Sequence, residues 1–148
     1  MKKTIIDIVF FTLVFALISC GTSVTEYEPK NQAEKELKAL LIEFQDYRNK
    51  HDLDGWLSLF RSDAKVMQGY GPGRKYVTKQ QARETEPETF RSYPTVKYAN
   101  PEMKVTGNQA LIRFDGTTQG LKHKETLQLV KENDRWLIIK FAYSNPFD

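Results

Sequence analysis

Three polar side chains that could do chemistry fall on one face of a predicted β-hairpin near the end of the chain. In residues 121–131, two-residue alternation places His123 and Glu125 on the same side as several leucines. Residues 132–134 form a polar turn, and the returning arm carries Lys140. A carboxylate or imidazole among apolar neighbours can act as a general base, because burial shifts its pKa. These three residues are therefore candidate pocket residues.

The pairing of the two arms decides which way Lys140 points. Counting from the turn sets Leu129 opposite Ile138 and Leu127 opposite Lys140, so that Lys140 lies diagonal to Glu125 on the inner face. We expect this register, because it buries the tryptophan of the second arm and agrees with the preceding hairpin. A slip of one residue would instead send Lys140 outward and bring three apolar residues of the second arm into the core: Leu137, Ile139 and Phe141.

The simplest interpretation of this group is structural. Glu125 and Lys140 would form an ion pair at a pocket mouth, with His123 solvated beside them. The catalytic alternative gives proton transfer or hydrolysis to Glu125 or His123, with Phe114 as an apolar wall opposite Glu125. The sequence has no Ser-His-Asp set, metal-ligand cluster or paired-carboxylate motif, so we assign no catalytic residue, metal or cofactor. Tyr70, beside a glycine–proline loop, is a further candidate for the pocket rim.

Composition limits the classes of partner. The chain has 148 residues, 28% of them charged, and a net charge of +3. This length and composition are typical of one globular domain. The net charge is small and no run of lysine or arginine is present, so we expect no nucleic-acid partner.

The first 19 residues have the organisation of a signal peptide. A cationic start is followed by an apolar run over residues 8–18, which is too short to span a bilayer but suits a secretory signal core. The run ends in Leu-Ile-Ser-Cys, which resembles the bacterial lipobox. That resemblance implies lipidation of Cys20 by palmitate-type acyl chains, after cleavage makes it the new N-terminus. The alternative is an ordinary signal peptide with an incidental cysteine.

This resemblance sets the expected location and organisation of the chain. We expect a lipid-anchored protein of the bacterial cell envelope. If the cell has an outer membrane, we expect it there by analogy, because position 21 is a glycine and not the aspartate that commonly retains lipoproteins at the inner membrane. Residues 20–30 would be the lipidated cysteine and a flexible tether, reaching about 16–20 Å. Residues 31–148 would form a domain without cysteine, which excludes disulfides and thiolate metal sites there.

Helices are expected in the first half of that domain. Asn31 with Glu34 and Thr78 with Gln81 are capping-box pairs, and Asp52 begins a short amphipathic helix between them. Strands follow from alternation and turn residues. They are expected at residues 64–70, 93–105 with a bulge near Pro101, 109–118, 121–131 and 135–143.

This order predicts an α+β fold, with N-terminal helices packed on a curved antiparallel sheet. The opposite face of the sheet is expected to be polar over residues 113–128. The last strand would add apolar residues to this outer face: Leu137, Ile139, Phe141 and Tyr143. Such a face suggests a cover, either a segment of this chain or a second subunit.

Three stretches resemble the nuclear transport factor 2-like superfamily, particularly its SnoaL-like bacterial members. They are Asp52-Leu53-Asp54-Gly55-Trp56, the strand from Ala110 to Phe114, and Arg135-Trp136-Leu137-Ile138. The resemblance covers residues 31–144 and implies a cone-shaped, cystatin-like domain with a pocket open at one end. Some members, such as ketosteroid isomerases and scytalone dehydratase, are enzymes, while others bind ligands or assemble. Because members often dimerise through the outer sheet face, the resemblance favours a homodimer.

The expected function is therefore binding at the envelope. The pocket would hold a small or peptide-like ligand, or the domain would hold a protein partner, without catalysis. A pocket enzyme using Glu125 or His123 is the alternative.

Overall fold

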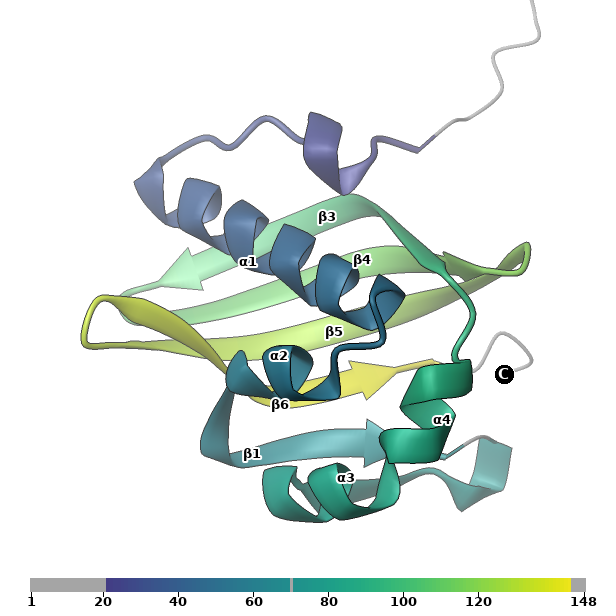
Figure 1. The fold of residues 1–148 in the computed structure, drawn as a ribbon. Helices are drawn as coiled ribbons and strands as arrows, with labels where there is room; N and C mark the ends of the chain where they lie inside the picture. Colours follow the sequence, from purple (N-terminus) through teal and green to yellow (C-terminus); the bar gives the residue numbers. More distant parts are fainter. Residues whose placement is uncertain (1–20, 70, 145–148) are drawn as a thin grey trace, which may run out of the picture.

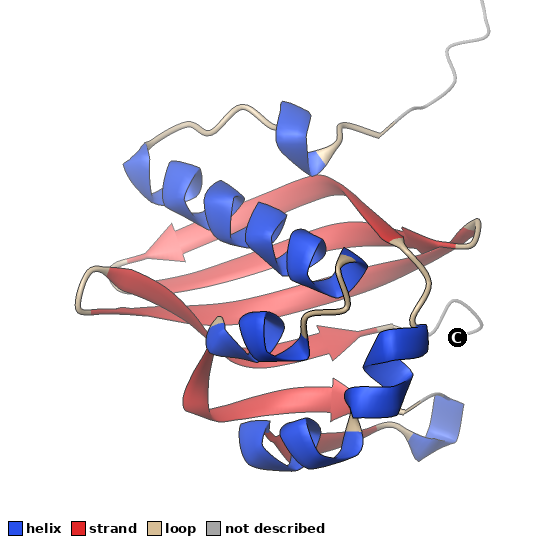
Figure 2. Ribbon diagram, viewed as in Figure 1, coloured by secondary structure: helices blue, strands red, loops and turns tan. Residues whose placement is uncertain are grey.

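The computed structural model describes residues 21–69 and 71–144, which form a layer of helices on one face of a curved sheet (Figures 1 and 2). The expected signal peptide, Cys20 and Tyr70 lie outside the described residues. The helices are η1 (Val24–Glu26), α1 (Gln32–Asn49), α2 (Leu53–Ser58), η2 (Gly71–Gly73), α3 (Lys79–Thr85) and α4 (Pro87–Ser92). The strands are β1 (Phe60–Gln68), β2 (Lys75–Thr78), β3 (Val96–Thr106), β4 (Gln109–Thr118), β5 (Leu121–Glu132) and β6 (Arg135–Tyr143). The α+β class is confirmed.

The sheet has the order β2-β1-β6-β5-β4-β3. Strands β3 to β6 form an antiparallel meander, whereas β1 runs parallel to β6, so the sheet is mixed rather than fully antiparallel. Helix α1 lies across the meander, and α2, α3 and α4 lie over the β6, β1 and β2 half (Figure 1). The helices therefore cover one face, and the opposite face of the sheet has no helix on it in the described part of the chain.

The helix starts follow the capping residues in the sequence. The Asn31 side chain accepts from the Glu34 backbone N–H at 2.9 Å, and Asp52 does the same for Gly55 at 2.8 Å. Thr78 forms a complete capping box with Gln81. Each cap satisfies a backbone donor that the first helical turn leaves free, which fixes the point at which the helix begins.

A β-bulge in β6 corrects the predicted register. Leu129 faces Ile138 as expected, but Gln128 then faces Lys140, and Leu127 faces Phe141. The extra residue, Ile139, lies between these two sets of pairs, and it reverses the alternation of the strand beyond it.

The bulge moves Lys140 out of the pocket, so the predicted ion pair with Glu125 is wrong. Lys140 shares the outer face with Gln128, and its Nζ lies 4.8 Å from the centre of the Tyr76 ring. The bulge also turns Phe141 inward, where it is buried. Tyr143 follows it, with the two ring centres 5.7 Å apart. Neither aromatic residue belongs to the outer face, contrary to expectation.

Phe44 of α1 lies at the centre of the core. Its ring is 5.5 Å from those of Trp56 and Phe141 and 5.9 Å from that of Tyr98. Trp136 is buried towards the other end of α1, as predicted, and its Nε1 donates to Glu36 at 3.0 Å. Together these contacts fasten α1 to the sheet along its length.

The segment Gly21–Tyr27, which we call the N-terminal strap, is not the flexible tether that the sequence suggests. Thr22 O accepts from the Asn100 backbone N–H at 2.8 Å, and Ser23 pairs with Ala99 of β3. The side chain of Val24 is buried with 1% exposure and belongs to the main core. The N-terminal strap is therefore packed against the rest of the described structure.

Candidate functional site

Four side chains from three elements form a buried polar cluster under α1: Arg48, Tyr98, His123 and Glu125. Arg48 Nη1 donates to Glu125 Oε1 at 2.9 Å and to Oε2 at 3.2 Å. Tyr98 OH donates to Oε2 at 3.1 Å, and His123 Nε2 lies 2.8 Å from Oε1. Because a carboxylate can only accept, the His123 proton at this contact lies on Nε2.

The local structure explains why these four residues meet. Arg48 follows Phe44 by four positions, so it lies one turn further along the buried face of α1. Tyr98 and His123 face Gly116 of β4 from its two sides. A Cβ atom on Gly116 would collide with the His123 imidazole, so the glycine provides the space that the ring occupies.

Electrostatics keep the cluster charged. Burial by itself would raise the pKa of Glu125, but the Arg48 charge and the contacts from His123 and Tyr98 outweigh it and hold this pKa below its usual range. Burial raises the pKa of Tyr98 well above its usual value, and the neighbouring carboxylate adds to the effect. The pKa of Arg48 is raised despite burial, because Tyr98 and Glu125 both favour its charged form. Glu125 is thus a carboxylate whose two oxygens already accept hydrogen bonds from three side chains.

The structure shows where the predicted site residues lie. It brings His123 and Glu125 together and sets Phe114 directly opposite Glu125. His123 is not solvated as expected, since its side chain is only 8% exposed. Lys140 does not join the predicted site, because the bulge places it opposite Gln128 on the outer face of the sheet.

Sequence reasoning missed Arg48 and Tyr98, which are the partners of Glu125. Arg48 continues the buried stripe of Leu37, Leu41 and Phe44 at helical spacing, but this is a weak signal because an arginine in the last turn of a helix is usually solvated.

An inner cavity of about 60 Å³ adjoins this cluster on the side of α4. That volume holds roughly two water molecules. Its walls include the aromatic rings of Trp56, Tyr93 and Phe141, and its polar lining includes Arg48 and Glu86. The Arg48 guanidinium carbon lies 4.7 Å from the centre of the Tyr93 ring. Glu125 does not line this cavity.

Two polar groups make the inner cavity unusual. Trp56 is 4% exposed, and its buried Nε1–H has no hydrogen-bond partner among the described residues. A buried donor left unpaired costs about 1–3 kcal/mol, so such a group commonly marks a site where another molecule supplies the acceptor. Glu86 has a raised pKa because of burial, although Gln68 and the Arg48 charge oppose the shift.

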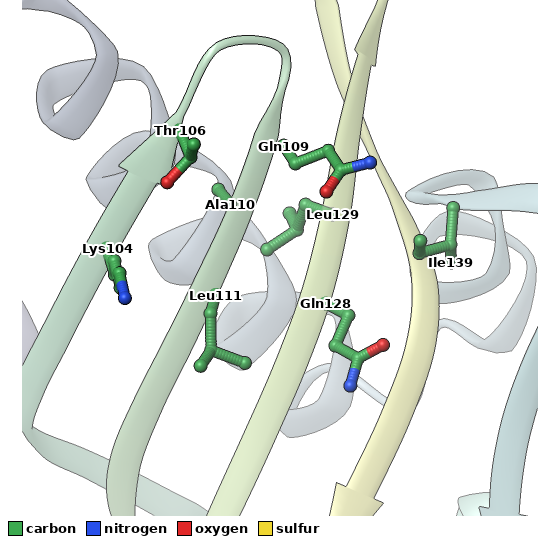
Figure 3. Close-up of a pocket in the computed structure, with 8 residues that line it drawn as sticks. All are labelled: Lys104, Thr106, Gln109, Ala110, Leu111, Gln128, Leu129 and Ile139. Atoms are coloured by element: carbon green, nitrogen blue, oxygen red, sulfur yellow. The ribbon is translucent and has the colours of Figure 1, made fainter.

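A second hollow, of about 290 Å³, lies on the outer face of the sheet (Figure 3). Leu111 and Ile139 provide apolar surface, and Lys104 and Gln128 provide polar groups. This hollow is shallow, and no side chain of the buried polar cluster lines it.

Among the described residues, no group of three or more histidine, cysteine, aspartate or glutamate side chains is placed to hold a metal ion. No helix in the same part of the chain is both long and apolar enough to cross a membrane.

Comparisons with known proteins identify the fold. No protein-family model matches the chain, and no curated protein matches it in sequence. Solved structures do match. An NTF2-like protein of unknown function from Pseudomonas putida is 15% identical with a TM-score of 0.68, over 78% of this chain and 88% of that one. A Nostoc punctiforme protein with a cystatin-like fold is 18% identical with a TM-score of 0.62, over 82% and 100%.

A third similar structure has a name that refers to an activity. A Shewanella frigidimarina protein, named provisionally as a ketosteroid isomerase, is 16% identical with a TM-score of 0.62, over 72% of this chain and 93% of that one. Identities this low carry the fold and no activity. The chain has a nuclear transport factor 2-like, cystatin-like fold.

Proposed function

We propose that this protein is a non-catalytic binding domain, held at the bacterial cell envelope by a lipid on Cys20. Its ligand presents an oxygen acceptor, such as a carboxylate or a peptide carbonyl, to the inner cavity. Two observations carry the proposal: Trp56 lines this cavity, and its buried N–H has no hydrogen-bond partner in the described part of the chain. Arg48 lines the same cavity, and its guanidinium favours an acceptor with negative charge.

The buried polar cluster supports binding over catalysis. A general base must contact the proton that it removes, but Glu125 is 1% exposed and does not reach the inner cavity. Its lowered pKa makes it a weaker base than a free glutamate, and Arg48, Tyr98 and His123 already use its oxygens. The similarity to a provisionally named ketosteroid isomerase does not alter this, because it extends to the fold alone.

The two indole N–H groups allow a direct test of binding. Acetate is the probe, since a two-carbon acid is comparable in size with the cavity. In a nitrogen–proton NMR spectrum we expect the Trp56 indole signal to shift on titration with acetate, while the Trp136 signal stays in place. Trp136 is the internal control because its N–H already donates to Glu36. Equal movement of both signals, or none at Trp56, would contradict the proposal.

Catalysis and anchoring need separate experiments. A β,γ-unsaturated ketosteroid incubated with the protein should isomerise no faster than in buffer, and turnover that Glu125→Gln abolishes would establish the enzyme instead.

For the anchor, mass spectrometry of the mature protein should find acyl chains on Cys20. Cys20→Ala should remain unprocessed or be mislocalised. Wild-type protein released in soluble form with an unmodified cysteine would refute the anchor.

A homodimer through the outer sheet face remains a prediction. The inward turn of Phe141 and Tyr143 leaves that face less apolar than expected. Leu111 and Ile139, both half-buried, line the hollow in Figure 3.

A further inference from the structure

We propose that the domain lies directly against an anionic lipid bilayer through one end of its sheet, instead of moving freely on a tether. The proposed contact surface, which we call the anchor-side end, consists of the N-terminal strap, the start of β3 and the β4–β5 turn. This inference rests on the lipid anchor at Cys20 that the proposed function includes.

The strap is fixed to the domain along its length. Thr22 and Ser23 pair with β3, and Val24 is inserted in the core. At the far end of the strap, Tyr27 O accepts from Lys38 Nζ at 2.7 Å, and Tyr27 OH donates to Glu34 at 2.8 Å. A segment with a buried side chain in its middle and hydrogen bonds at both ends does not act as a flexible spacer.

The covalent chain then places the lipid close to the sheet edge. Gly21 is so near Asn100 that a Cβ atom on it would collide with the asparagine side chain. Cys20 directly precedes Gly21 in the sequence, so one residue separates the acylated position from Thr22, which pairs with β3. Acyl chains on Cys20 therefore begin beside the edge of β3, which brings this edge to the membrane surface.

The residues around this edge suit an anionic surface. Lys97 and Lys122 face Thr117 from its two sides, and all three lie close to the β4–β5 turn. Neither lysine has an ion-pair partner in the described part of the chain. Leu121, the first residue of β5 after this turn, is 48% exposed, which is unusual for a large apolar side chain among the described residues. Lysines next to an exposed leucine are a combination that binds anionic headgroups and the interface below them.

The opposite end of the strands has a different character. Its β5–β6 turn contains Asp134 and follows Glu132. Two cations there are already paired, Arg61 with Glu132 at 2.9 Å and Lys131 with Glu36 at 2.8 Å, and Arg135 donates to Ser58 O at 3.2 Å. In Figure 1 the strap meets β3 towards the end where β4 turns into β5, away from the β5–β6 turn. The lipid and the unpaired lysines therefore favour the same orientation.

Fluorescence quenching on vesicles tests this orientation. The lipidated full chain is reconstituted in vesicles of three parts phosphatidylcholine to one part phosphatidylglycerol, with nitroxide-labelled headgroups. A dye is attached to an azide-bearing amino acid that replaces either Leu121 or, as the matched control, Asn108 in the β3–β4 turn. The two positions are separated by the length of β4, ~30 Å. We expect quenching at position 121 to exceed that at position 108 by about twofold or more, whereas equal quenching would overturn the proposal.

Charge variants test the chemistry of the contact. Lys97→Glu combined with Lys122→Glu should bring quenching at position 121 close to that at position 108. Lys104→Glu, at the other end of β3, should change the quenching at neither position 121 nor position 108. An unchanged difference in the double variant would refute a role for the two lysines.

Failure of the anchor can be separated from failure of the orientation. If mass spectrometry finds Cys20 unmodified, the anchoring part of the proposed function is wrong. The same dye-labelled chains are then coupled at the Cys20 thiol to a maleimide phospholipid, and the comparison of positions 121 and 108 is repeated. Unequal quenching in that experiment supports the contact surface, and equal quenching refutes it.

Discussion

Arg48 Nη1 lies 2.9 Å from Glu125 Oε1, and this ion pair joins the last turn of α1 to the middle of β5 across 77 positions of the sequence. Both side chains are buried, with 9% and 1% exposure. Removing one partner of such a pair leaves a buried charge without compensation, whereas replacing both can be nearly neutral.

The first prediction follows from that asymmetry. Arg48→Met should lower the free energy of unfolding by about 3–5 kcal/mol, because Glu125 stays buried without its cation. The double variant Arg48→Met with Glu125→Leu should recover a large part of this loss. Urea denaturation of the wild type and both variants measures these free energies of unfolding. An Arg48→Met variant as stable as the wild type would show that the pair contributes little.

The second prediction concerns pH. The pKa of Glu125 is lower in the folded protein than in the unfolded chain, so its contribution to stability is present above the unfolded value of about 4.3 and is lost as the pH falls through the folded value. The stability advantage of the wild type over Glu125→Gln should therefore be largest at neutral pH and should shrink in acid. Denaturation at a series of pH values measures this advantage.

Glu86 provides a control of opposite sign. Its pKa is raised by burial, so its favourable contribution is present below the unfolded pKa and is lost as the pH rises through the folded pKa. The free energy of unfolding of Glu86→Gln, relative to that of the wild type, should consequently be highest at neutral pH. If the stabilities of Glu125→Gln and Glu86→Gln, relative to the wild type, changed with pH in the same direction, the lowered pKa of Glu125 and the raised pKa of Glu86 could not both be right.

The third prediction tests the space beside His123. Gly116→Ala should destabilise the protein by about 1–3 kcal/mol, because the added methyl group meets the imidazole. Gly73→Ala is the matched control, since an added Cβ at Gly73 has open space around it. Thermal unfolding gives the stability, and the His123 ring signals in NMR show whether the ring leaves Glu125. Equal effects of the two substitutions would mean that Gly116 has no such packing role.

The fourth prediction concerns the core at the other end of α1. Trp136→Ala should cost about 3–5 kcal/mol through lost burial and the cavity that it leaves. Trp136→Phe keeps an aromatic ring but loses the hydrogen bond to Glu36, so it should cost much less. Calorimetry of both variants checks this order, and an unchanged melting temperature in Trp136→Ala would refute the buried position.

The fifth prediction concerns association. If the outer sheet face forms a homodimer, Ile139→Lys should shift the protein to the monomer in sedimentation equilibrium, because the residue lines the outer hollow. Lys35→Glu, at an exposed position of α1 on the helix-covered side of the sheet, should leave the equilibrium unchanged. A wild-type protein that is monomeric at all accessible concentrations would exclude the dimer.

The sequence predicted the elements well because their signals are local. Alternation sets the strand faces and a cap such as Asn31 sets a helix start, so the α+β class and the Phe114–Glu125 pairing could be inferred. The bulge was missed, although it has a signature: Ile138 and Phe141 are both buried but lie three positions apart, which strict alternation forbids.

The partners of Glu125 could not be inferred in the same way. Arg48 and Tyr98 are 77 and 27 positions away, and only the packing of α1 on β3 and β5 brings them to it. An arginine in the last turn of a helix is usually solvated and favourable to the helix dipole, so its local context indicates a surface residue. Local patterns therefore placed Glu125 on the inner face but could not identify what neutralises it.

The last strand in the sequence, β6, occupies a central position in the sheet, between β5 and β1. Until Arg135–Tyr143 has been synthesised, β1 lacks its parallel neighbour and β5 has one open edge. The native sheet therefore cannot close on the nascent chain, and its long-range pairing makes folding a late and comparatively slow event. Such an order of folding would be compatible with the export that the proposed lipid anchor requires, because the polypeptide stays unfolded until β6 has been made.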